Sequence, residues 1–436
     1  SAMSDLSNYD YLIIGNSAGA VGCIEGLRSV DRDGTIGLVA EEDCHVYSRA
    51  LIPYYLNGLI SINRMYFRPF DFYDSANVSF FRGQRAVKID AQQRLVELID
   101  GSRLGYGKLL IATGGKPVYP PIPGLDKQNV YSFHSMSDML GIEKELTSAR
   151  SAVVLGGGIT GLMAAEVLSK RGIEVHVIEL AERLLAAVVD ETASEIVKAA
   201  AEKAGVTFYL NNTIDRLHGT ERVEKVTLKD GREISCDLLI VAVGVAPRVE
   251  LTAGTGIEVR RGIVVNQKMQ TSVPDIFACG DCASIYDFTT GTQQYLPLWP
   301  NAYLGGRIAG YNMAGVEKEF VQGTAMNSMH FFDINIVSAG ISVTGANHEG
   351  DLDELKEYRQ DSQTYRKFII SGKGHIKGFI MVGQIARAGI FLNLMRRRID
   401  VRAFQQALLN KDFGYADLPE ELRWGLLQDE VILGVV

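Results

Sequence analysis

The sequence predicts an α/β protein of 436 residues with two βαβ units and a separate C-terminal region. Two glycine-rich turns carry this prediction, because each follows a short apolar strand and precedes a helix. The composition agrees, since 47% of the residues are apolar and 22% are charged, the balance of a globular protein with a sizeable core. At about 150 residues per domain, the length fits roughly three domains.

Charge and composition exclude several classes of protein. The formal net charge is −8, so a nucleic-acid binder that relies on a general positive field is not expected. No apolar run reaches the ~18 residues of a membrane-spanning helix, and nothing at the start of the chain suggests a secretory leader. The scattered cysteines indicate a reducing compartment, so we expect a cytoplasmic protein. They are Cys23, Cys44, Cys236, Cys279 and Cys282.

The first glycine-rich turn joins a predicted strand at 10–14 to a helix. It consists of Gly15, Asn16, Ser17, Ala18, Gly19 and Ala20. This is a degenerate form of the G-x-G-x-x-G/A turn that binds dinucleotides: Gly15 permits the tight turn, and Ser17 stands where a glycine usually lets the backbone approach a diphosphate. The helix that follows this turn and runs to about Val30 offers free N–H groups to that diphosphate, and Ala20 is small enough for the helix to pack on the strand. The alternative is an ordinary βα turn without a ligand.

The next predicted strand, at 36–40, ends at two adjacent acids. An acid at this point of a βαβ unit can hold the hydroxyl pair of a ribose. On spacing we favour Glu41 over Glu42 for this role.

The second glycine-rich turn is the stronger signal, because all three glycine positions are filled. It consists of Gly156, Gly157, Gly158, Ile159, Thr160 and Gly161. It follows a predicted strand at 152–155 and opens a helix that ends near Arg171. Glu179 ends the next strand, close to the ~20-residue spacing at which an acid reads the ribose of a dinucleotide. Its carboxylate would accept from both hydroxyls of an unphosphorylated ribose and repel a 2′-phosphate, which favours NADH over NADPH.

Two further apolar segments end in groups that suit a flavin. The first, at 109–115, ends in a glycine turn that contains Ala112, Thr113 and Gly114. The second, at 276–283, delivers Asp281, whose carboxylate suits the ribityl hydroxyls of a flavin. The alternative for Asp281 is a helix N-cap.

Together these four segments resemble the FAD-dependent pyridine nucleotide–disulfide oxidoreductase superfamily, from about residue 8 to about residue 322. Within it, the segments at 47–55 and 296–302 are similar to NADH oxidases and to the flavoprotein module of NADH nitrite reductases. They also resemble NADH-linked FAD subunits of anaerobic aldehyde and 2-oxoacid oxidoreductases. The resemblance implies an α/β fold with two Rossmann-like dinucleotide-binding domains and a C-terminal α+β interface domain. We expect the FAD-binding domain at 1–117 and 241–322, the inserted NAD-binding domain at 118–240, and the interface domain at 323–436.

The resemblance also implies FAD and NAD(H) as cofactors and assigns residues to each. FAD contacts are expected at Gly15, Ser17, Ala18, Ala20, Glu41, Arg49, Ala86, Ala112, Thr113, Gly114, Asp281 and Trp299. NAD contacts are expected at Gly156, Gly158, Ile159, Thr160, Gly161, Glu179 and Gly244.

The resemblance assigns chemical roles to a few of these positions. In related proteins, a glutamate at the position of Glu166 reaches the junction of flavin and nicotinamide; the alternative is a core carboxylate paired locally. Arg49 would hold the pyrophosphate or stabilise reduced flavin, and a surface ion pair is its alternative. Residues 297–301 lead into a helix expected at 302–314, and Pro300 suits its first turn. The N-terminus of this helix would favour the negative charge of reduced flavin. Trp299 would stack near the ring or pack at an interface.

The active-site cysteines of this superfamily are missing from the sequence. Disulfide reductases carry C-x4-C after the first acid, and single-cysteine members place a cysteine where this chain has Ala50. We interpret Cys44 as a loop residue, and Cys279 and Cys282 as small buried residues rather than a redox pair or metal ligands. No metal-ligand spacing of histidines is present, so no metal is expected. The expected chemistry is hydride transfer from NADH to flavin without a thiolate.

The expected function is an FAD-dependent NADH:acceptor oxidoreductase whose acceptor is an iron–sulfur protein or subunit. The alternatives are a stand-alone NADH oxidase that reduces O2 and a redox-responsive FAD- and NAD-binding protein. A helix expected at 385–398 ends in Arg396, Arg397 and Arg398, which form a candidate docking patch for an acidic partner or a merely solvated helix face. We expect Ile390, Leu394 and Met395 to anchor this helix. A homodimer or a subunit of a larger complex is expected.

Overall fold

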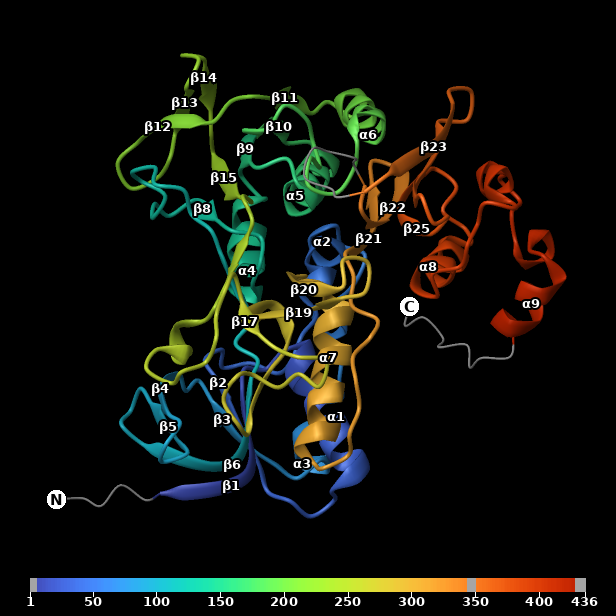
Figure 1. The fold of residues 1–436 in the computed structure, drawn as a ribbon. Coiled ribbons are helices and arrows are strands. Elements are labelled where there is room, and N and C mark those ends of the chain that lie inside the picture. Colours follow the sequence, from blue (N-terminus) through green and yellow to red (C-terminus); the bar gives the residue numbers. More distant parts are fainter. Residues whose placement is uncertain (1–5, 343–349, 428–436) are drawn as a thin grey trace. The chain divides into compact units, whose positions relative to one another are not determined.

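The computed structural model describes residues 6–342 and 350–427, and they form two compact units. The first unit combines the chain up to Pro117 with Val245–Thr324. The second combines Val118–Gly244 with the chain from Ala325 onward. Figure 1 shows each unit drawing on separate stretches of the sequence.

A seven-stranded sheet is the scaffold of the first unit. Its parallel strands are β3 (Val78–Arg82), β2 (Ile36–Ala40), β1 (Ser7–Ile14), β6 (Arg103–Ile111) and β18 (Ile276–Ala278). An antiparallel pair, β5 (Leu95–Leu98) and β4 (Ala86–Asp90), continues the sheet from β6. The central strands are apolar on both faces because the sheet is covered on both sides, as parallel sheets require.

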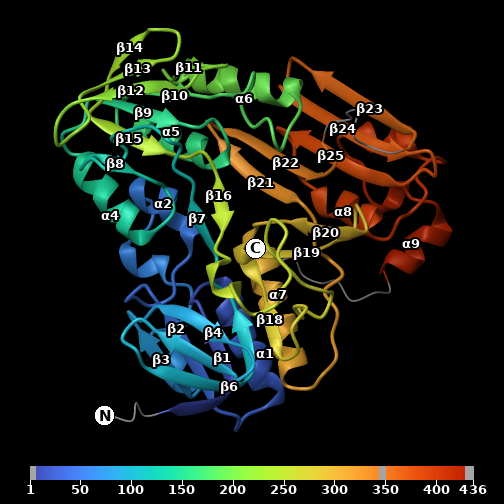
Figure 2. The same ribbon diagram turned by 60° about the vertical axis from the view of Figure 1, so that its left-hand side comes forward.

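Two helices of the first unit, α1 (Ala18–Val30) and α7 (Trp299–Met313), pack backbone against backbone (Figures 1 and 2). Glycines make this approach possible. A Cβ added to Gly22 would lie 2.2 Å from the carbonyl oxygen of Tyr303, and one added to Gly306 would lie 2.0 Å from that of Gly19. The N-termini of both helices are held in place by this contact.

Shorter elements complete the first unit. They are the helices α2 (Ile52–Leu56) and α3 (Phe72–Ser75), the strand pair β7 (Gly115–Pro117) and β16 (Val245–Pro247), and a sheet of β17 (Ile263–Val264), β19 (Ala283–Asp287) and β20 (Thr292–Tyr295). Single 3-10 turns lie at Arg49–Leu51, Ile62–Met65, Glu250–Thr252 and Gly280–Cys282.

The second unit begins with a five-stranded parallel sheet in the order β11-β10-β9-β15-β8. Its strands are β8 (Val130–Tyr131), β9 (Ser151–Leu155), β10 (Glu174–Ile178), β11 (Thr207–Tyr209) and β15 (Leu238–Val241). Its helices are α4 (Met136–Glu145), α5 (Ile159–Lys170) and α6 (Glu191–Lys203). A small antiparallel sheet contains β12 (Ile214–His218), β13 (Lys225–Leu228) and β14 (Glu233–Ser235).

The rest of the second unit is a five-stranded antiparallel sheet, visible in Figure 2, followed by short helices. The strands are β21 (Met326–Phe331), β22 (Ile334–Gly340), β25 (Ile376–Val382), β24 (Thr364–Ser371) and β23 (Leu352–Arg359). The helices are α8 (Ala388–Arg396), α9 (Glu420–Leu427) and 3-10 turns at Gln405–Leu409 and Tyr415–Asp417.

This antiparallel sheet shares a hydrophobic core with the parallel part of the second unit. Phe331 and Ile380 of the sheet belong to one buried cluster with Leu162 of α5 and Val197 of α6. A polar contact reinforces it: Asp190, which caps α6, accepts a hydrogen bond of 2.6 Å from the buried hydroxyl of Tyr365. The residues expected to form a separate third domain therefore pack directly on the segment at 118–244.

The structure confirms the α/β fold class and corrects three expected elements. Helix α7 begins at Trp299 rather than at residue 302, while Pro300 lies in its first turn as expected, where the missing N–H is harmless. No helix follows Asp281; a 3-10 turn leads into strand β19, so the N-cap interpretation was wrong. Helix α8 is shorter than expected because residues with positive φ flank it, Arg387 at 72° and Arg398 at 51°.

Candidate functional site

The first glycine-rich turn lies at the carboxyl end of β1, beside the carboxyl end of β6. Gly15 has a φ of 109°, and a Cβ there would lie 1.9 Å from the carbonyl oxygen of Ala112. Only glycine fits this position. Ser17 is the N-cap of α1 and makes no side-chain capping bond, while Ala18 and Ala20 are buried in the helix–sheet contact. The turn therefore leaves the first N–H groups of α1 open to a ligand.

Three strand ends bring predicted flavin residues to the same edge of the sheet. β18 pairs with β6 in the register Ala278–Ile111, so Asp281 follows its strand at the level where Ala112, Thr113 and Gly114 follow theirs. Gly114 has a φ of 72° and open space where a side chain would be. Burial raises the pKa of the Asp281 carboxyl, and the positive charge of Arg49 opposes that shift. A half-buried carboxylate of this kind calls for hydrogen-bond donors from a partner.

Arg49 lies between protein partners of its own. Its guanidinium contacts Glu42 Oε1 at 2.7 Å and the hydroxyl of Tyr47 at 2.7 Å, and its side chain is 31% exposed. Burial lowers the pKa of Arg49, but the charges of Tyr47 and Glu42 outweigh it and the pKa is raised. The ion pair that was the alternative role for Arg49 is thus present in the structure, formed with Glu42. Glu42 is committed to this pair, which leaves the exposed Glu41 at the end of β2 as the ribose candidate.

Ala86 and Trp299 occupy the margins of this region. Ala86 starts β4, just beyond a segment in which the N–H of Gln84 donates to the carbonyl of Ala40 at the end of β2. Trp299 is the first residue of α7, and its ring stacks on Tyr303 with 5.7 Å between centroids. Trp299 also meets Phe67 edge to face at 5.8 Å. Trp299 thus packs on aromatic rings of the first unit, and neither its stacking near a flavin nor a place at an interface is tested by these contacts.

The second glycine-rich turn has the same design in the second unit. Gly156 has a φ of 117°, and a Cβ there would lie 2.0 Å from the carbonyl oxygen of Ala242. A Cβ on Gly161 would lie 1.9 Å from the carbonyl oxygen of Gly156. Gly158, in contrast, faces open space and is the N-cap of α5 without a side-chain bond. Close packing thus requires glycine at positions 156 and 161. The open space at Gly158 leaves room for a diphosphate.

The remaining predicted NAD residues surround this turn. Glu179 follows β10, and its carboxylate accepts the N–H of Gly157 at 2.5 Å and that of Ala181 at 2.8 Å. Ile159 and Thr160 form the first turn of α5, half-buried and exposed. Gly244 follows β15 with a φ of 108° and open space around it. The glutamate is therefore fixed beside the glycine turn.

Glu166 is held by contacts within the second unit. Its carboxylate accepts the N–H of Phe332 and lies 3.5 Å from the ammonium of Lys170. The residue is 8% exposed. These contacts match the interpretation of a core carboxylate paired locally, and its role at the cofactors stays a prediction.

The arginines at the end of α8 differ from one another. Arg396 is half-buried, and burial together with Arg397 lowers its pKa. Arg397 donates to Asn393 at 3.2 Å, and Arg398 is exposed. Phe391, not Ile390, is the fully buried anchor of this helix beside Leu394 and Met395. The three arginines are therefore unequally available to a partner.

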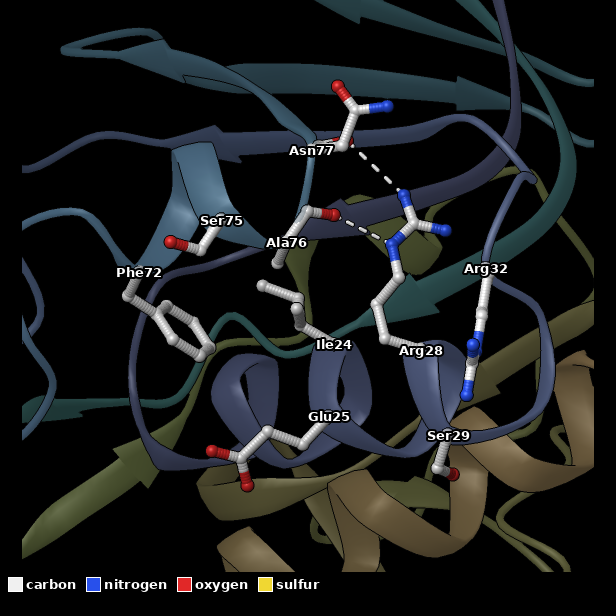
Figure 3. Close-up of a pocket in the computed structure, with 9 residues that line it drawn as sticks. All are labelled: Ile24, Glu25, Arg28, Ser29, Arg32, Phe72, Ser75, Ala76 and Asn77. Carbon is white, nitrogen blue, oxygen red and sulfur yellow. Dashed lines mark hydrogen bonds between the residues drawn. The ribbon is translucent and has the colours of Figure 1, made fainter.

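A cavity of ≈ 580 Å³ lies between α1 and the segment at 72–77, and nine residues line it (Figure 3). Two of the three charged residues that line it, Arg28 and Glu25, already have protein partners. Arg28 donates to the carbonyl oxygens of Ala76 at 2.6 Å and Asn77 at 3.2 Å, and Glu25 accepts from Arg68 at 2.7 Å. We assign no ligand to this cavity.

Comparison with known proteins decides what the two glycine turns belong to. Residues 9–306 match the family model described as pyridine nucleotide-disulphide oxidoreductase. The chain belongs to this family.

Relatives within the family share most of the length of the chain. The NADH-dependent phenylglyoxylate dehydrogenase subunit epsilon of Aromatoleum evansii is 32% identical over 90% of this chain and 92% of its own. The NADH oxidase of Methanocaldococcus jannaschii is 30% identical over 93% and 94%. Among solved structures, a ferredoxin reductase from Rhodopseudomonas palustris has a TM-score of 0.80 and 26% identity, covering 87% of this chain and 93% of that one.

Membership of this family makes the chain an FAD-dependent, NAD(H)-dependent oxidoreductase. The residues fit both cofactors: each glycine turn is closed by a strand-end carbonyl on one side and open at a helix N-terminus on the other. Within residues 6–342 and 350–427, no group of three or more His, Cys, Asp or Glu side chains could hold a metal ion. In the same part of the chain, no helix is long and apolar enough to cross a membrane.

The cysteines are poor candidates for the thiol chemistry in the name of the family. Cys23, Cys236, Cys279 and Cys282 are buried, and burial raises the pKa of each thiol. Cys44 is half-buried, and burial together with Glu42 raises its pKa to about 11. At neutral pH these groups are thiols rather than the thiolates that attack disulfides or flavins.

Flavin reduction is therefore expected to proceed without a thiolate. Replacing Cys44 with serine and the buried cysteines with alanine should leave NADH-to-dye activity largely intact. Rapid-scan absorbance during reduction should show no long-wavelength thiolate–flavin band. A loss of activity confined to Cys44→Ser, with the flavin still bound, would revive a cysteine mechanism.

Sequence reasoning missed two polar residues beside the flavin segments, Tyr295 and Thr324. Their hydroxyl groups are buried without a hydrogen-bond partner among the described residues. Neither residue belongs to a motif, and only the tertiary structure shows that they are unpaired.

Proposed function

We propose that this protein is an NADH:acceptor oxidoreductase that passes electrons through FAD to an iron–sulfur protein or subunit. The observation that carries the proposal is the pairing of two cofactor turns with cysteines that are all buried or of raised pKa. Without a thiol relay, electrons leave directly from the flavin. A one-electron acceptor suits that exit, because a flavin takes two electrons together and can release them singly.

The names of two relatives support different parts of this proposal, the first a role as a subunit and the second an iron–sulfur acceptor. One is the epsilon subunit of a dehydrogenase, and another is a ferredoxin reductase, ferredoxins being iron–sulfur proteins. We propose by analogy that this chain also works as a subunit or with a separate partner, as a homodimer or within a larger complex. The free cysteines agree with a cytoplasmic location, which we propose as well.

The residues of the chain have separate tasks in this proposal. In the segment at 118–240, the open turn at Gly158 and the N-terminus of α5 bind the NADH diphosphate, and Glu179 binds the ribose. In the first unit, the turn at Gly15 binds the FAD diphosphate and Asp281 accepts from the ribityl hydroxyls. When bound, the two cofactors supply hydride transfer from NADH to the flavin. The positive N-terminus of α7 favours the charge of the reduced flavin.

A second candidate function is a stand-alone NADH oxidase. The relative from Methanocaldococcus jannaschii, which carries that name and matches almost the whole chain, favours it. The two functions differ in what reoxidises the flavin.

Steady-state turnover with different acceptors tests the proposal. We expect fast NADH oxidation with one-electron dyes, slow consumption of O2, and co-purification of an iron–sulfur protein from the native source. O2 consumption stoichiometric with NADH, at the rate seen with dyes, would contradict the proposal and support the oxidase.

The arginines at the end of α8 give a prediction about the partner. Neutralising Arg396, Arg397 and Arg398 together should slow electron transfer to the native partner and flatten its dependence on salt, because complementary charge speeds encounter at low ionic strength. Reduction of the flavin by NADH should not change.

Single variants sharpen this test. Arg398→Gln should carry most of the effect, since Arg398 is the exposed member. Arg402→Gln is the matched control, because the charge of Arg402 is already paired with Asp400. If the triple variant reduces the partner at the original rate at every salt concentration, the patch is structural.

A further inference from the structure

Two hydroxyl groups of the first unit are buried and unpaired. Among the described residues, neither Tyr295 OH nor Thr324 Oγ1 has a hydrogen-bond partner, and Thr324 is 4% exposed. A buried hydroxyl without a partner loses its hydrogen bonds to water and gains none in return. Since buried polar groups in proteins are nearly always paired, an orphaned pair in a cofactor-binding unit indicates a ligand.

Tyr295 lies next to the turn that carries Asp281. It ends strand β20 and is paired with Ser284 of β19, the strand that begins two residues after Asp281. The guanidinium of Arg261 lies over the face of the Tyr295 ring, 4.6 Å from its centroid, and packs against it. Burial and the nearby Asp281 both raise the pKa of Tyr295, so its hydroxyl stays protonated and able to donate.

Thr324 lies next to the N-terminus of α7. Its carbonyl oxygen accepts a hydrogen bond of 3.3 Å from the side chain of Asn301, which is in the first turn of that helix. The same Asn301 amide lies 3.5 Å from the carbonyl oxygen of Leu296, the residue after Tyr295. Helix α7 also packs on the 3-10 turn of Asp281. The two residues whose hydroxyls lack a partner therefore both contact elements that flank Asp281.

We propose that Tyr295 and Thr324 form hydrogen bonds with the bound FAD, Tyr295 with its polar chain beside Asp281 and Thr324 with its ring system beside α7. The two residues extend the cofactor site beyond the motif positions. The inference rests on flavin binding by the first unit and is independent of the acceptor, so it stands or falls separately from the iron–sulfur proposal.

Isosteric variants of the full-length protein test it. In Tyr295→Phe and Thr324→Val the hydroxyl is lost while the shape is kept. Each holoprotein should bind FAD about 3- to 10-fold more weakly, the value of one hydrogen bond, as measured by flavin fluorescence on dilution. The control is Tyr311→Phe, whose hydroxyl is already paired with Arg307 at 3.0 Å and whose loss should leave FAD affinity unchanged.

Thermal unfolding without FAD separates a ligand contact from a structural one. Because the hydroxyls have no partner among the described residues, the melting temperature of the FAD-depleted variants should equal or exceed that of the parent, and only the stabilisation by added FAD should shrink. FAD affinity unchanged in both variants would overturn the proposal. So would a lowered melting temperature of both FAD-depleted variants, which would show that the hydroxyls have partners within the protein.

Discussion

Asp281→Ala is expected to lose its flavin during purification. The Asp281 carboxylate is held in a largely buried place at the end of β18, where the raised pKa shows that the protein alone solvates it poorly. Hydrogen bonds to a charged acceptor contribute about 1.5–3 kcal/mol each, so losing two of them weakens FAD binding on the order of 10²-fold or more. The measurement is flavin absorbance per protein after gel filtration.

Asp275→Asn is the matched control for this change. Asp275 lies just before the opposite end of β18, where it is paired with Lys108 and Arg94 away from the glycine turns. The control should remain yellow. An Asp281→Ala protein that keeps a full complement of FAD would show that Asp281 is not a flavin ligand.

NADH is expected to reduce the flavin on the order of 10²- to 10³-fold faster than NADPH at equal, subsaturating concentration. We propose that Glu179 is the reason: its carboxylate, fixed by the N–H groups of Gly157 and Ala181, would accept from the ribose hydroxyls and repel a 2′-phosphate, a difference of several kcal/mol at most. Stopped-flow reduction under anaerobic conditions measures it.

A charge-removing variant identifies the residue responsible. Glu179→Gln should reduce the preference for NADH over NADPH, because it removes the repulsion of the 2′-phosphate. Glu174→Gln, at the exposed start of the same strand, should leave that preference unchanged. Equal rates for the two nucleotides in the unaltered protein would contradict the role of Glu179.

The two glycine turns could be predicted from sequence because their backbone conformation and close packing require glycine. Gly15 and Gly156 have positive φ values and meet strand-end carbonyls within 2.0 Å of a would-be Cβ, so no other residue serves there. The strand that carries Asp281 was equally visible as an apolar run before a glycine. The start of α7 was misplaced, because Trp299 and Pro300 resemble a lead-in and still fit a first helical turn.

Features that depend on distant partners could not be predicted. The count of charges predicted a basic patch at the end of α8. Which of its arginines are available to a partner depends on the fold, because Arg396 is half-buried and Arg402 is paired with Asp400. The bond between Glu166 and the N–H of Phe332 joins residues far apart in sequence. That the Tyr295 hydroxyl has no partner within residues 6–342 and 350–427 can be seen only from the folded arrangement of those residues.

A double-mixing stopped-flow experiment tests the central claim most directly. The protein is first reduced anaerobically with stoichiometric NADH and is then mixed with either an oxidised iron–sulfur partner or O2. We predict flavin reduction without a thiolate–flavin band, followed by reoxidation that is faster with the iron–sulfur partner than with O2. Reoxidation that is faster with O2, or reduction that passes through a thiolate–flavin band, would contradict the account.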